Sequence, residues 1–66
     1  MRIIVNQQPQ QCDHQCTLQQ LVQQLDINPN GLALAVNQQV IAKRLWSEHA
    51  LQPDDQVVAF QIVTGG

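Results

Sequence analysis

The sequence predicts an α+β domain, a mixed sheet with one main helix packed on one face and a flexible C-terminal Gly-Gly arm. Three observations support this prediction: a single helical pattern with a clear start signal, apolar strand patterns on both sides of it, and Gly65-Gly66 shortly after the last apolar run. Strands, one helix and then more strands is an order in which one helix covers one face of a sheet. We expect residues 1–66 to form one domain, with residues 63–66 as the arm.

The helix is predicted to start at Thr17. Thr17 and Gln20 match a capping box, in which the Thr17 hydroxyl accepts from the Gln20 backbone N–H and the Gln20 side chain reaches back to the Thr17 N–H. The apolar residues that follow are three and four positions apart and therefore share one stripe of the helix: Leu18, Leu21, Val22 and Leu25. The run of turn residues 28–31 ends the helix.

Apolar segments bounded by turn residues are the predicted strands. They are residues 1–6, a weaker extended stretch reaching Cys12, residues 32–36, a short return strand starting at Val40, and residues 57–63. Turns are expected at residues 7–9, 37–39 and 51–56, and in the last of these Pro53 and Asp54 suit the two central positions. Residues 43–50 have no clear period, and we expect Trp46 to anchor them at the edge of the core.

Composition excludes several classes of protein. A chain of 66 residues buries only about 60% of its unfolded surface, so a deep active-site cleft is not expected. With 44% hydrophobic and 12% charged residues the chain is predicted to fold, and its net charge of -2 provides no basic stripe for nucleic acid. The apolar run at the N-terminus is too short for a signal peptide, and no segment has the length of a membrane span. Two cysteines are too few for a disulfide framework, so thiols in the cytoplasm are expected.

The ending predicts a carboxylate that is presented to another protein. A carboxylate is a poor electrophile, and its activation requires that it enter a partner enzyme's nucleotide site. Glycine has no Cβ and lets another backbone approach closely, so Gly65 and Gly66 fit a channel too narrow for side chains, and Thr64 is assigned to the same arm. The alternative interpretation is an ordinary frayed terminus.

The last strand is apolar on both of its alternating faces. Val58, Phe60 and Ile62 form one set, and Val57, Ala59 and Val63 form the other. A single helix covers only one face of a sheet, so the second set is either buried in another way or kept for a partner. The sequence does not fix which set faces outward, and we take Val58, Phe60 and Ile62 as the candidate docking residues.

The element order together with the diglycine resembles the ubiquitin-like β-grasp family and, within it, the ThiS-type sulfur carriers of thiamine (thiazole) biosynthesis. The resemblance covers the whole chain and rests on residues 3–6, residues 17–26, residues 33–40, Trp46 and residues 55–66. The chain departs from the pattern in two places. Ala42-Lys43 stands where such carriers often have Pro-Arg, which affects a partner contact, and Asp54 stands where glycine is common, so Asp54 has to adopt a conformation that glycine favours.

The resemblance implies a protein co-substrate rather than an enzyme. In such carriers the terminal carboxylate, here that of Gly66, is adenylated with ATP by an E1-like adenylyltransferase of the ThiF type. Sulfur from a sulfur-donating protein then displaces AMP to leave a thiocarboxylate, and a thiazole synthase of the ThiG type receives the sulfur. The chain is expected to bind no cofactor itself, since it has no phosphate-binding glycine loop.

Two other functions with the same fold stay open at this point. One is a sulfur carrier of another pathway, such as the small subunit of molybdopterin synthase, although those chains are usually longer. The other is a ubiquitin-like modifier of target lysines, for which Lys43 is the only lysine through which the chain could be joined to itself.

The motif Cys12-Asp13-His14-Gln15-Cys16 raises the question of a metal or redox site. Cys12, His14 and Cys16, with His49 as a fourth ligand, do not match a common zinc spacing, so no metal site is predicted. Cys16 precedes the helix and could have a lowered pKa, but a partly buried ordinary thiol is the favoured interpretation, with both histidines at the surface. The adjacent Asp54 and Asp55 are assigned to turn formation rather than to acid-base catalysis.

Overall fold

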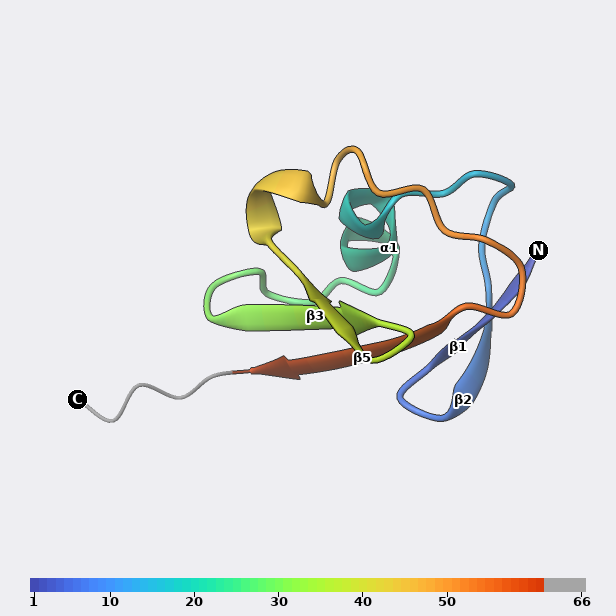
Figure 1. The fold of residues 1–66 in the computed structure, drawn as a ribbon, viewed down its shortest axis with the longest axis horizontal. Helices are drawn as coiled ribbons and strands as arrows, with labels where there is room; N and C mark the ends of the chain where they lie inside the picture. The colour runs from blue at the N-terminus through green and yellow to red at the C-terminus, as the bar shows by residue number, and fades with distance from the viewer. Residues whose placement is uncertain (62–66) are drawn as a thin grey trace.

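The computed structural model describes residues 1–61, which form a mixed sheet with one α-helix on one face (Figure 1). The elements in chain order are β1 (Arg2–Val5), β2 (Gln8–Gln11), α1 (Leu18–Gln24), β3 (Leu32–Val36), β4 (Gln39–Ile41), the 3-10 helix η1 (Lys43–Leu45) and β5 (Gln56–Gln61). The strand order is β2-β1-β5-β3-β4. β1 and β5 run parallel, whereas the other neighbouring strands are antiparallel. The predicted α+β architecture is confirmed, and it places the C-terminal strand at the centre of the sheet.

Helix α1 begins with the predicted capping box. The Thr17 hydroxyl accepts from the Gln20 N–H at 3.2 Å, and the Gln20 side chain accepts from the Thr17 N–H at 2.9 Å. The predicted apolar stripe packs against the sheet, with Leu18, Leu21 and Val22 buried and Leu25 partly buried. The helix therefore covers one face of the sheet, and the opposite face has no helix packed on it within residues 1–61.

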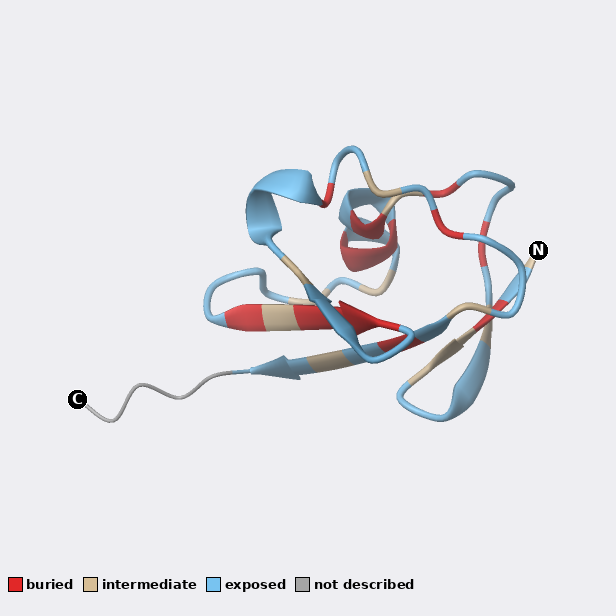
Figure 2. Cartoon of the chain, in the orientation of Figure 1, coloured by how far each residue is buried: buried red, intermediate tan, exposed pale blue. Residues whose placement is uncertain are grey.

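The core lies between α1 and the sheet (Figure 2). Its largest fully buried side chains come from all parts of the chain: Trp46, Ile3, Leu18, Leu21, Leu34, Leu51 and Val57. Trp46 is 1% exposed and its Nε1–H donates to the Ile41 carbonyl at 3.0 Å, which confirms it as the anchor of residues 43–50. Within the part of the chain that the structure describes, no helix is both long and apolar enough to cross a membrane.

The turn before β5 has the expected central residues. The Asp55 N–H donates to the Gln52 carbonyl at 3.1 Å and closes a β-turn around Pro53 and Asp54. Asp54 has φ 66°, the left-handed conformation for which glycine is common at this position. Aspartate tolerates this conformation better than most residues, so the departure from the family pattern is accommodated in the backbone.

Three predicted turns extended too far into the strand that follows them. Gln8 and Pro9 were expected in a turn but belong to β2, where they pair with Val5 and Ile4. Gln39 was expected in a turn but belongs to β4, where it pairs with Val36. Gln56 was also expected in a turn but belongs to β5, where it pairs with Ile4. Glutamine has no strong preference for a strand or a turn, so pairing with a neighbouring strand decides its state. The predicted last strand, residues 57–63, is described as far as Gln61, and its end lies outside the described residues.

Both β-hairpins turn through two residues in the left-handed region, and neither turn contains glycine. Asn6-Gln7 joins β1 to β2 with φ values of 50° and 68°, and Asn37-Gln38 joins β3 to β4 with φ values of 50° and 72°. Positive φ at both positions is the type I′ geometry, for which Asn-Gly is a preferred pair. Asparagine tolerates this region, whereas glutamine at the second position carries a steric cost that glycine avoids.

Replacing Gln38 by glycine is therefore expected to stabilise the chain by about 0.5–1 kcal/mol. The left-handed conformation costs an L-residue about 1–2 kcal/mol, and the larger entropy of glycine in the unfolded chain offsets about 0.4–1 kcal/mol of the gain. Urea unfolding measures the difference. Gln39→Gly is the matched control and should destabilise, because Gln39 is the first residue of β4 and pairs with Val36. Equal losses of stability in both variants would contradict the turn assignment.

Candidate functional site

Strand β5 leads to the predicted reactive end of the chain. Gly66, the predicted modification site, and Thr64 and Gly65, the predicted arm, lie outside the described residues, as does the docking candidate Ile62. Their structural support is described: β5 lies between β1 and β3 and extends to Gln61 (Figure 1). Whatever holds the backbone of β5 in place therefore also fixes where the terminal residues begin.

The docking candidates Val58 and Phe60 lie on the face of the sheet opposite α1. Val57 is 1% exposed and belongs to the core, so its neighbours in the strand alternation point away from the core. Val58 is 48% exposed and Phe60 is 43% exposed. The structure thus settles which set of β5 faces outward.

Apolar residues of the neighbouring strands extend this surface. Val58 is paired with Ala35 of β3, and Ala35 is paired in turn with Val40 of β4, which is 66% exposed. Phe60 is paired with Ala33. We call this surface the open face and define it as Ile4, Ala33, Ala35, Val40, Val58 and Phe60. Val40, Val58 and Phe60 are its exposed members, whereas Ile4 and Ala33 are partly buried and Ala35 is buried. An exposed apolar surface of this kind marks an interaction site more often than a scattered apolar residue does.

Sequence reasoning missed the members of the open face that lie outside β5. A signal was present in β3, where large Leu32, Leu34 and Val36 alternate with small alanines. The large set is buried against α1, so the alanines face the other side. Ile4 is placed in the same way by alternation with buried Ile3. The sequence shows both alternations, but it does not show that these strands are neighbours of β5.

Two asparagines hold the backbone of β5 from opposite sides. The Asn6 Oδ1 accepts from the Ala59 N–H at 2.9 Å, and the Asn37 Oδ1 accepts from the Gln56 N–H at 3.0 Å. In regular ladders these two N–H groups would reach the main-chain carbonyls of the same asparagines. Each asparagine is instead the first residue of a left-handed turn, and its side-chain oxygen takes the place of its carbonyl. Sequence reasoning assigned neither residue this role.

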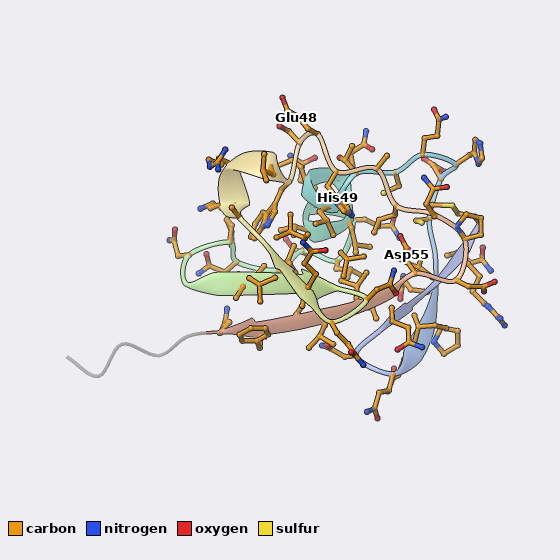
Figure 3. All side chains as sticks on the ribbon, in the orientation of Figure 1. Glu48, His49 and Asp55 are labelled. Carbon is orange, nitrogen blue, oxygen red and sulfur yellow. The ribbon has the colours of Figure 1, made fainter. Side chains whose placement is uncertain are left out.

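Asp55 connects one of these turns to the turn before β5 (Figure 3). The Asn37 Nδ2 donates to Asp55 Oδ1 at 3.1 Å, and the Gln52 N–H donates to Asp55 Oδ2 at 2.8 Å. Asp54 forms an exposed ion pair with Arg2 at 3.3 Å. The assignment of both aspartates to turn structure is confirmed by these bonds.

Similarity to known proteins decides the family. The ThiS family model matches residues 3–66. The chain is 41% identical to the sulfur carrier protein ThiS of Escherichia coli (strain K12) over 66 residues, which is the whole of both chains. The chain belongs to the ThiS family. It is also 31% identical to an uncharacterized protein of Porphyra purpurea over 64 residues, covering 97% of this chain and 90% of that protein.

A solved structure confirms the predicted β-grasp fold. The crystal structure of the thiamine biosynthesis protein ThiS from Geobacter metallireducens matches with a TM-score of 0.89 over the whole of both chains. The two sequences are 19% identical, so this likeness concerns the fold alone. The fold thus persists at 19% sequence identity.

Cys12 and Cys16 of this ThiS family member are free, buried thiols. Burial raises the pKa of the Cys16 thiol, and the neighbouring Cys12 and Asp13 raise that pKa further. A raised pKa lowers the fraction of thiolate, which is the reactive form. The structure therefore does not show an activated thiol at Cys16. The Cys16 side chain is buried, whereas the sequence predicted partial burial.

The histidines lie away from the open face. His14 is exposed, and His49 is half-buried beside α1, where its carbonyl accepts from the Leu18 N–H at 3.1 Å (Figure 3). The expectation of a surface position holds for His14 and only in part for His49. Residues 1–61 contain neither a pocket nor a group of three or more His, Cys, Asp and Glu side chains arranged for a metal ion.

Proposed function

We propose that this chain is the sulfur carrier of thiamine biosynthesis and that it acts as a protein co-substrate rather than as an enzyme. The observation that carries the proposal is the 41% identity to the Escherichia coli sulfur carrier protein ThiS over the full length of both chains. The match to the family model extends through Gly66, so it includes the end of the chain at which the chemistry is proposed.

The proposed chemistry takes place on the Gly66 carboxylate. An E1-like adenylyltransferase of the ThiF type binds ATP, and the carboxylate attacks the α-phosphate, so pyrophosphate leaves and an acyl-adenylate forms. A sulfide equivalent supplied by a sulfur-donating protein then attacks the carbonyl carbon, and AMP leaves to give the thiocarboxylate. A thiazole synthase of the ThiG type takes up this sulfur. The nucleotide is held by the partner, and the chain contributes the reacting group.

The open face is the proposed contact surface for these enzymes. Val58 and Phe60 lie on the strand that leads to the reactive end, so a partner that covers them also receives that end in a fixed register. The apolar side chains supply affinity through burial, at roughly 25 cal/mol per Å². The two asparagine contacts hold the backbone of β5 at Gln56 and Ala59.

Complementation in bacteria tests the pathway. Expression of the chain should restore growth without added thiamine to a strain that lacks its own ThiS. It should not restore activity of a molybdenum-dependent enzyme in a strain that lacks the small subunit of molybdopterin synthase. A Gly66 deletion variant is the matched negative control and should restore neither. Rescue of the second strain alone would overturn the assignment to thiamine biosynthesis.

A further inference from the structure

Strand β5 has a free edge over its C-terminal half. β1 pairs with β5 only at Ile4 with Gln56 and at Val5 with Val57, whereas β3 pairs with β5 as far as Gln61. Residues 58–61 thus have a strand neighbour on one side only, and Figure 1 shows this part of β5 beside β3 alone. β5 is therefore a central strand at its start and an edge strand over residues 58–61.

Asn6 defines where this edge begins. Its N–H donates to the Val57 carbonyl at 2.9 Å and its Oδ1 accepts from the Ala59 N–H at 2.9 Å, after which the chain turns away into β2. The next groups on this side are the Ala59 carbonyl and the Gln61 N–H, because alternate residues of a strand point their backbone groups to opposite neighbours. The pairing of β5 with β3 uses the backbone groups on the other side of the strand, and β1 pairs with β5 only as far as Val57, so among residues 1–61 no strand neighbour faces these two groups.

The other two sheet edges are blunted, and this one is not. Edge strands attract further strands unless they are short, charged or interrupted by proline. β2 carries Pro9 in the middle, and β4 has only three residues. Residues 58–61 of β5 contain neither proline nor charge. Of the edges in the described part of the chain, this one is the best suited to accept a strand.

The geometry points to an extended backbone segment of the adenylating enzyme that pairs with β5 at Ala59 and Gln61 and so continues the sheet. This inference rests on the proposed function. Gly66 is five residues beyond Gln61, and a five-residue chain spans at most about 18 Å. An enzyme whose nucleotide site receives Gly66 therefore has its own chain close to this edge. Strand addition supplies main-chain hydrogen bonds as affinity, while the adjoining Val58 and Phe60 supply contact area.

Strand pairing also fixes a register, which is what the chemistry requires. A slip of two residues along β5 would displace the terminal carboxylate by about 7 Å, far more than activation tolerates. Hydrogen bonds from the enzyme to Ala59 and Gln61 would fix the position of the terminal segment relative to the enzyme's nucleotide site. The asparagine contacts lie within this chain, so they fix β5 only relative to the rest of the same chain.

Backbone N-methylation tests this pairing. A chain of 66 residues is accessible to chemical synthesis, and a methyl group on the Gln61 amide removes the donor and blocks a neighbouring strand. The matched control is N-methylation of Gln11, whose amide faces the outer edge of β2, because Cys12 bonds inward to Met1. Both derivatives should unfold at the parent's midpoint. In ATP-pyrophosphate exchange with the adenylating enzyme, kcat/KM should fall about tenfold for the Gln61 derivative and stay near the parent's for the Gln11 derivative.

Amide exchange gives an independent readout. Binding of the adenylating enzyme should slow hydrogen exchange of the parent's Gln61 N–H by about tenfold or more, and the Gln11 N–H should be unaffected. Parent-like kinetics of the Gln61 derivative, or unchanged Gln61 exchange in the complex, would overturn the inference. Concentration-dependent protection of Gln61 without enzyme would assign the edge to a second copy of the chain and would overturn it too. A parent chain that no competent enzyme adenylates would instead refute the proposed function itself.

Discussion

Adding one alanine after Gly66 is expected to lower adenylation of the chain by at least about a hundredfold. The added residue turns the Gly66 carboxylate into an amide and moves the new carboxylate about 3.3–3.6 Å further along an extended chain. Catalytic positioning is sensitive to shifts of about 1 Å, so the new carboxylate misses the α-phosphate of ATP. ATP-pyrophosphate exchange with the purified adenylating enzyme measures the loss.

Two further variants separate length from bulk in this experiment. Gly66→Ala keeps the length of the chain and adds one methyl group, so it should retain at least about tenfold more activity than the extended chain. Gly65→Val keeps both the length and the carboxylate but adds a β-branched side chain that a narrow channel excludes, so it should be strongly impaired. All three variants should keep the parent's thermal midpoint, because the buried core described for residues 1–61 lies within residues 3–57. Normal exchange rates for the extended chain would contradict the proposed register.

Truncating Val58 and Phe60 to alanine together is expected to lower kcat/KM for adenylation by about a hundredfold. The two side chains are about half exposed, on the open face, and next to the reactive end. Interface residues that matter for binding cost more than about 1 kcal/mol each when truncated, and a loss of about 1.4 kcal/mol at each of the two positions is a factor of ten for each. The loss should appear in KM, because the changed residues bind the partner and do not react.

Leu45→Ala is the matched control for the open face. Leu45 is also an exposed apolar residue, at 36%, but it belongs to η1 and not to the open face. Its truncation should leave kcat/KM close to the parent value. Equal effects of Leu45→Ala and of the double variant, or parent-like kinetics of the double variant, would remove the open face from the account.

The sequence was sufficient to predict those elements that a short local pattern of residues determines. Thr17 and Gln20 form the capping box because both partners lie within one turn of helix. Pro53 and Asp54 form the turn because both residues favour its backbone angles. Trp46 was expected in the core because it is the only tryptophan of the chain and a large apolar side chain, and it is 1% exposed. The capping box and the turn depend on neighbours in the chain.

Features that depend on the pairing of distant segments could not be predicted in this way. The roles of Asn6 and Asn37 require that β1 and β3 flank β5, which follows from the strand order and not from either turn sequence. The members of the open face in β1, β3 and β4 have the same origin. The resemblance to the β-grasp family supplied the fold, but the free edge of β5 became visible only when the short pairing with β1 was known.

Intact-mass spectrometry tests the central claim most directly. The chain is incubated with ATP, a ThiF-type adenylyltransferase and a sulfur-donating protein, and its mass is measured before and after alkaline hydrolysis. We expect a mass gain equal to the exchange of one oxygen for one sulfur, localised by fragmentation to Gly66, present equally when Cys12 and Cys16 are both replaced by serine, and absent without ATP. An unchanged mass at Gly66 with partners that convert the Escherichia coli ThiS protein, or sulfur found on Cys12 or Cys16 instead, would contradict the account.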